Sequence, residues 1–144
     1  MLKDKLKLDA VKALKDGDSF QVGVLRFLIS LIDKKEMQLP PGEMKKEDEI
    51  GVLRKEMKNK EESVKMFKEA ERKDLYEPVE KEMEILLGYM PKELSEEEIR
   101  GMVDKVLAAN EGVDFAMAMR ETMKEVAGRA GGQIVSQIVR EKLS

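Results

Sequence analysis

The spacing of apolar residues between Lys46 and Ala70 constrains the fold of this chain more than any other feature. In this highly charged stretch, apolar side chains recur at steps of three and four, which is the period of one helix face. Lys60 fills the one position where an apolar residue is missing. The same step continues through residues 75–89, so we expect an antiparallel helical hairpin with a short turn at residues 71–74. The facing apolar residues are predicted to be Leu53, Met57, Val64 and Phe67 on one helix and Tyr76, Val79, Met83 and Leu86 on the other.

The remainder of the chain also shows helical periodicity, and no stretch has a convincing strand pattern. Residues 2–15 are predicted to form a helix that stops at Gly17. A second, mostly apolar helix follows and ends before Pro40, because proline cannot continue a helix. Pro78 is expected in the first turn of its helix, where proline is tolerated. The composition agrees with an all-α fold, since it is rich in Ala, Leu, Met, Glu and Lys.

Three shorter helices are predicted after Pro91. Ser95 and Glu98 have the spacing of a capping box, Asp114 can cap the next helix, and a glycine-rich turn at residues 128–132 precedes the last one. We therefore expect two domains. Residues 1–92 form an N-terminal helical domain that contains the long hairpin, and residues 93–144 form a compact three-helix bundle.

The residues that the chain lacks exclude several classes of chemistry. It contains no histidine, cysteine or tryptophan, so zinc fingers and nucleophiles activated by histidine are ruled out. We predict no catalytic residue, no metal site and no cofactor. No apolar run approaches the ~20 residues that span a bilayer, which favours a cytoplasmic protein without membrane contact. Three acidic clusters are interpreted as exposed helix faces or first turns: Glu47-Asp48-Glu49, Glu61-Glu62 and Glu96-Glu97-Glu98.

The glycine-rich turn allows two interpretations. Free backbone N–H groups at a helix N-terminus beside Arg129 would suit an anion such as phosphate. Alternatively, Gly128 ends one helix and Gly131 or Gly132 begins the next, which makes the turn a joint between packed helices. Neither of the common phosphate-loop patterns is present, so the residues alone favour the joint.

Three segments together resemble the YqeY-like family over essentially the whole chain. Residues 89–99, YMPKELSEEEI, resemble one signature of that family, and residues 114–132 resemble a second signature that ends in GRAGG. The stretch 54–75 is similar to the middle block of the family. The C-terminal half of the family is similar to the tail domain of GatB, a subunit of the glutamine-dependent amidotransferase that acts on Glu-tRNA or Asp-tRNA.

This resemblance implies tRNA, or proteins of tRNA amidation or translation, as partners. It also implies an alternative, a carbon–nitrogen ligase activity with glutamine as amido donor. A third interpretation does not depend on the resemblance: a protein-interaction scaffold that uses the charged helical hairpin. We expect no such enzyme activity from the chain alone, because no amidase constellation or nucleotide loop is present. The candidate nucleic-acid-binding residues are Arg120, Lys124, Gly128, Arg129, Gly131, Gly132, Arg140 and Lys142.

Four positions depart from the family pattern. Ala116 and Met117 replace its glycine and lysine, Ala127 stands where a lysine is frequent, and Gly131 replaces an aspartate. The loss of two basic positions puts the tRNA contact in question, whereas glycine can replace aspartate as a helix cap at small cost.

Overall fold

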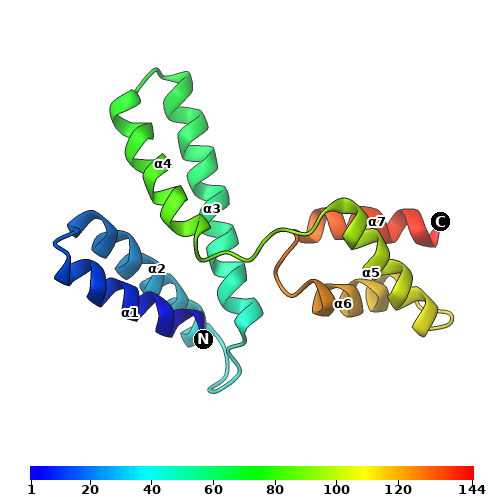
Figure 1. Cartoon of the computed structure of the whole chain (residues 1–144). Coiled ribbons are helices and arrows are strands. Elements are labelled where there is room, and N and C mark those ends of the chain that lie inside the picture. Colours follow the sequence, from blue (N-terminus) through cyan, green and yellow to red (C-terminus); the bar gives the residue numbers. More distant parts are fainter. The chain divides into compact units, whose positions relative to one another are not determined.

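Helices account for all the regular structure of the computed structural model, which describes residues 1–144 (Figure 1). The expected all-α class is therefore confirmed. None of the helices combines the length and the apolar character that crossing a membrane would require. In chain order the helices are α1 (Leu2–Lys15), α2 (Ser19–Gln38), α3 (Lys46–Glu69), α4 (Lys73–Leu87), α5 (Glu96–Ala109), α6 (Phe115–Val126) and α7 (Gly132–Leu143).

The chain divides into two compact units. Unit 1 comprises Met1–Met90 and contains α1 to α4, and unit 2 comprises Pro91–Ser144 and contains α5 to α7. Each unit has its own cluster of buried apolar side chains. That the two units are domains that fold independently stays a prediction.

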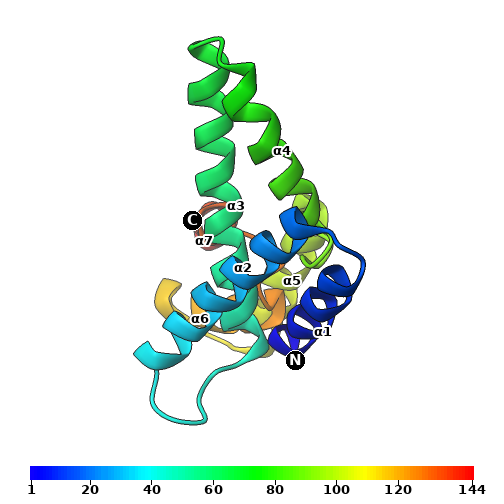
Figure 2. The same ribbon diagram turned by 90° about the vertical axis from the view of Figure 1, so that its left-hand side faces the viewer.

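In unit 1, α1 packs along α2, and α3 packs along α4. The end of the α3–α4 hairpin projects away from α1 and α2 in both views (Figures 1 and 2). The core lies where α2 crosses the first half of α3, and α1 and the end of α4 cover it. Its buried residues are Leu6, Ala10, Val24, Leu25, Leu28, Ile32, Leu53, Met57 and Leu86.

The hairpin differs from the prediction at its turn. α4 begins at Lys73, because the carbonyl of Arg72 already accepts the N–H groups of Leu75 and Tyr76. Pro78 is therefore the sixth residue of the helix, so its expected place in the first turn is wrong. Phe67, expected on the facing seam, is half-buried rather than part of the core.

The first acidic cluster lies in the first turn of α3, one of the two places expected for it, but Glu49 within it is buried. Its side chain is 1% exposed, and its Oε2 accepts the backbone N–H of Lys3 at 2.8 Å. That N–H belongs to the first turn of α1, where amides have no partner within the helix, and Met1 provides no side-chain cap. A carboxylate from α3 thus caps α1, which the pattern of charges along α3 could not reveal.

In unit 2, the three helices pack on one another around a small apolar core. Both N-cap residues expected here cap their helices: Ser95 accepts the N–H of Glu98, and Asp114 accepts the N–H of Met117. The expected capping box is only half present, because the Glu98 carboxylate accepts the Ser95 hydroxyl at 3.1 Å. The buried residues are Ile99, Val103, Ala118, Val126, Ala130, Val135, Ile138 and Val139.

Candidate nucleic-acid interface

The turn between α6 and α7 uses left-handed backbone at two successive residues, Ala127 (φ 49°) and Gly128 (φ 79°). This conformation costs a residue other than glycine roughly 1–2 kcal/mol. The turn is held in place by a hydrogen bond from the N–H of Leu94 to the carbonyl of Arg129, at 2.9 Å, and by the buried side chain of Ala130. The glycine-rich segment is therefore a joint between packed helices, as the favoured interpretation predicted.

Arg129 folds back onto the end of α6. Its Nε donates to the carbonyl of Val126 at 3.0 Å, and its Nη2 donates to the carbonyl of Glu125 at 2.9 Å. The last carbonyls of a helix have no partner within it, and a cation there also complements the helix dipole. Arg129 therefore has a structural role. Because a guanidinium carries five N–H donors, these two bonds leave part of it for a further acceptor.

Arg120 and Lys124 lie one turn apart on the outer face of α6. Both are exposed, as are Ala116 and Met117 on the same face, while Ala118 on the opposite face is fully buried. Lys124 lies 3.2 Å from the carboxylate of Glu121, and both partners are solvent-exposed enough for water to weaken this pair. Arg120 thus projects its charge outward, one turn before Lys124.

The start of α7 has no side-chain cap, because the N-cap residue is Gly131. The first hydrogen bond of the helix joins the N–H of Val135 to the carbonyl of Gly131 at 3.4 Å. The N–H groups of Gly132, Gln133 and Ile134 lie in the first turn of α7, before that first hydrogen bond. Such groups attract anions.

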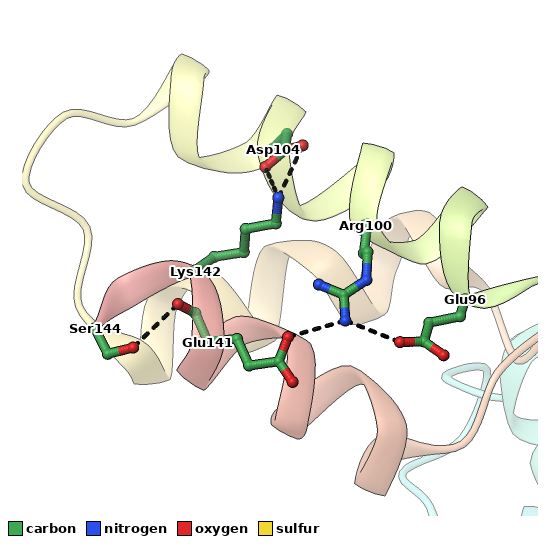
Figure 3. A network of polar contacts seen from close by, with 6 residues as sticks. All are labelled: Glu96, Arg100, Asp104, Glu141, Lys142 and Ser144. Atoms are coloured by element: carbon green, nitrogen blue, oxygen red, sulfur yellow. Dashed lines mark hydrogen bonds and ion pairs between the residues drawn. The ribbon is translucent and has the colours of Figure 1, made fainter.

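The remaining two candidates lie elsewhere in unit 2. The guanidinium of Arg140 sits 5.4 Å from the ring centroid of Phe115, the first residue of α6. This contact is at the end of α6 opposite to the glycine turn, roughly 16 Å away at 1.5 Å per residue. Lys142 instead reaches α5 and pairs with Asp104 at 3.0 Å (Figure 3).

Lys142 belongs to a network of charges between α5 and α7 that the sequence did not predict. Arg100 lies at its centre, with Nη2 at 2.8 Å from Glu96 and at 2.9 Å from Glu141 (Figure 3). The hydrogen bonds that Arg100 donates, first to Glu96 and then to Glu141, raise its pKa above the ordinary value. The i, i+4 spacing of Glu96 and Arg100 was the available signal for this network.

The eight candidate residues consequently do not form one patch. Gly128, Arg129, Gly131 and Gly132 lie together at the α6–α7 turn, and Lys124 and Arg120 continue from that end along the outer face of α6. Lys142 pairs with Asp104 on α5, and Arg140 lies beside Phe115 at the other end of α6, so neither lies at the turn. We call the six residues that lie together the α6–α7 surface.

The sequence comparisons agree with the resemblance drawn from the three segments. The sequence model of the family described as Yqey-like protein matches residues 3–143. No curated protein matches the chain. Because the match spans nearly the whole sequence, the chain belongs to the YqeY-like family.

Proposed function

We propose that unit 2 binds tRNA, or a structured RNA of similar charge, through the α6–α7 surface. The observation that carries this proposal is the uncapped first turn of α7 beside the cations of α6. Phosphate groups pair both with helix N-terminal amides and with arginine and lysine side chains. A surface that offers both is suited to a phosphate backbone.

The distribution of charge within unit 2 supports this proposal. Residues 115–144 contain five lysines and arginines and three acidic residues, whereas residues 91–114 contain three and seven. The positive charge is thus concentrated on α6 and α7, although the whole chain has a net charge of −3. Local rather than global positive charge would then attract the RNA.

The departure at Gly131 favours this binding instead of opposing it. An aspartate at this N-cap would occupy the first-turn amides and add a negative charge beside them. Glycine leaves the amides open to another acceptor.

The experiment is a titration of unfractionated tRNA with the full chain at two salt concentrations. Arg120→Ala is the informative variant, because Arg120 is exposed on α6, whereas Arg129 also caps that helix. Loss of one phosphate contact should weaken binding several-fold and reduce the slope of log affinity against log salt by about one. Lys105→Ala removes an equal charge from an exposed position of α5 and serves as the control.

A second variant separates binding from folding. Gly131→Asp adds a helix cap at a position where a Cβ atom meets nothing within 4 Å, so stability should rise by a few tenths of a kcal/mol. Affinity for tRNA should fall, because the carboxylate competes for the same amides. Equal affinities for Arg120→Ala, Gly131→Asp and Lys105→Ala would remove the α6–α7 surface from RNA binding.

Two other functions are alternatives to RNA binding by unit 2. If the chain has an accessory role in glutamine-dependent amide transfer, tRNA binding should require an amidotransferase subunit. The same titration would then show binding only when that subunit is present. A protein-interaction role is favoured by a separate observation, the exposed aromatic residues of unit 1.

A further inference from the structure

Two of the four phenylalanines of the chain lie on the surface of one helix in unit 1. Phe20 is 41% exposed and Phe27 is 47% exposed, and their separation of seven residues places them on the same face of α2. The buried core cluster of unit 1 contains no phenylalanine. Large aromatic side chains that the chain's own core does not use are enriched in protein–protein interfaces.

This face of α2 forms one wall of a groove whose other wall is α3. One cavity of about 560 Å³ lies between Lys34 and Lys55, and a second of about 330 Å³ lies between Phe27 and Lys60. Glu56 lines both cavities, so they form one continuous groove. The floor is apolar at Val24, Leu31 and Val52.

A glycine lies on each wall of the groove. Gly23 is in the second turn of α2 and Gly51 is in the first half of α3, and a Cβ atom at either position would meet nothing within 4 Å. Glycine inside a helix costs about 1 kcal/mol relative to alanine. Packing within the chain does not require either glycine, but close approach of another backbone would.

The charge of the groove changes sign along its length. At the Phe27 end, Lys60 lies 3.4 Å from Glu56 and 2.9 Å from Glu82, so two carboxylates share one ammonium group. At the other end, Lys34, Lys35 and Lys55 outnumber Glu47 and Asp48. Glu56 lines both cavities, but its carboxylate pairs with Lys60, so it is counted at the Phe27 end. With that assignment, the Phe27 end is acidic by one charge and the lysine-rich end is basic by one charge.

We propose that this groove is the interface of a homodimer, in which α2 of one copy lies antiparallel to α2 of its partner. A two-fold axis near Phe27 and Leu31 places the acidic end of each copy against the lysine-rich end of the other. A surface with opposite charges at its two ends is complementary to itself under this operation, and two-fold dimers are the commonest assemblies. This inference concerns unit 1 and is independent of RNA binding by unit 2.

The size of the face sets the expected affinity. From Phe20 to Gln38 the face is about 27 Å long, and two helices are ~20 Å wide. Its projected area of roughly 540 Å² is below the ~800 Å² per partner of a typical stable complex. The dimer should therefore be weak and should dissociate on dilution.

The first test is sedimentation velocity of the full chain between about 1 μM and 500 μM, a range chosen to span the dissociation constants of interfaces this small. We expect the wild type to shift from monomer to dimer. Phe27→Asp should weaken the dimer at least tenfold, because each interface loses two central rings. Leu8→Asp is the matched control, since Leu8 is 71% exposed on α1, outside the groove, and this variant should dimerise like the wild type.

The second test uses the absence of cysteine from the chain, which makes a single introduced thiol an unambiguous probe. Ser30→Cys changes one atom at an exposed position one turn from Phe27, close to the proposed axis. Near a two-fold axis each thiol meets its own counterpart, so mild oxidation should yield a disulfide-linked dimer much faster than for Leu8→Cys.

A wild type that stays monomeric over the whole range would overturn the proposal. A dimer in which Ser30→Cys and Leu8→Cys cross-link equally fast, or in which folded Phe27→Asp dimerises like the wild type, would also overturn it, since the interface would then lie elsewhere.

Discussion

Unit 1 buries charged side chains, whereas unit 2 keeps its charges at the surface. In unit 1, Lys60 is 8% exposed and Glu49 is 1% exposed. In unit 2, the only buried polar residue is Thr122, and its ion pairs, such as those of Arg100 and Lys142, lie on the outside of the bundle (Figure 3).

The difference follows from helix length and crossing. α3 is 24 residues long, and it packs against α2 near one end and against α4 near the other. A charged residue at an apolar position of this helix, such as Lys60, is therefore enclosed by neighbouring helices. The helices of unit 2 have 12 to 14 residues, and a single apolar stripe on each is enough to close the core. Long crossing helices thus enclose charges that short ones leave in water.

The largest effect is expected from removing the buried cation of unit 1. Lys60→Ala leaves Glu56 and Glu82 without the ammonium group between them, in a site where Lys60 and Glu56 have side chains only 10% and 15% exposed. Breaking such a pair costs about 3 kcal/mol. Lys142→Ala, which breaks a surface pair with Asp104, should cost less than about 1 kcal/mol. Urea denaturation of both variants measures their losses in the free energy of unfolding. Equal losses would contradict the difference between the two units.

Calorimetry of the same two variants tests the domain division. If the units unfold independently, the wild type shows two transitions, and Lys60→Ala lowers the midpoint of one of them without moving the other. A single transition that both variants shift would show that the units unfold together.

The buried charges of unit 1 also show which parts of the structure the sequence could predict. Apolar residues spaced three and four apart predicted every helix, because an amphipathic stripe shows which side of a helix is buried. The same spacing showed that Lys60 stands where an apolar residue is expected. The sequence could not predict that Glu49 is buried. Its position depends on the start of α1, 46 residues away, where the N–H of Lys3 needs an acceptor.

The candidate site was predictable to a similar degree. The glycine turn and its neighbouring cations were found from the sequence, since they are close along the chain. Their separation from Arg140 and Lys142 was not, because it depends on which neighbour each side chain contacts, Phe115 in one case and Asp104 in the other. Local sequence defines the ends of helices well and the partners of long side chains poorly.

An intermediate effect is expected from the phenol of Tyr89, which links the end of α4 to α1. Its hydroxyl donates to Oδ2 of Asp9 at 2.5 Å. Burial first, and this hydrogen bond second, raise the pKa of Tyr89 above its ordinary value of 10.0. A raised pKa in the folded state means that the contribution to stability is complete below pH 10 and is lost as pH rises further.

Tyr89→Phe should therefore cost about 2 kcal/mol at pH 7, a value typical of one hydrogen bond to a charged acceptor. Above pH 10 the wild type should lose stability more steeply than the variant, so that the two curves approach each other. Urea midpoints of both proteins from pH 7 to pH 11 measure this difference. Parallel curves would show that the phenol does not link α4 to α1.

The smallest effect is expected at two left-handed residues, where the two units should behave alike. Glu71 (φ 55°) follows α3, and Ala127 (φ 49°) follows α6. After α3, the N–H groups of Glu71 and Arg72 bond to the carbonyls of Lys68 and Phe67, the same pattern that Gly17 (φ 75°) makes after α1. Glycine adopts this conformation without steric cost, although it loses more backbone entropy on folding.

Glu71→Gly and Ala127→Gly should consequently each stabilise their own unit by about 0.5–1 kcal/mol, the difference between these two opposing contributions. Gly17→Ala is the reverse control and should destabilise unit 1 by about 1 kcal/mol, because it places a Cβ atom on left-handed backbone where the native chain has none. Thermal midpoints of the three variants provide the measurement. If Ala127→Gly lowers stability while Glu71→Gly raises it, the methyl group of Ala127 contributes packing that exceeds its backbone strain, and the turn of unit 2 is then held by side-chain contacts as well as by its glycine.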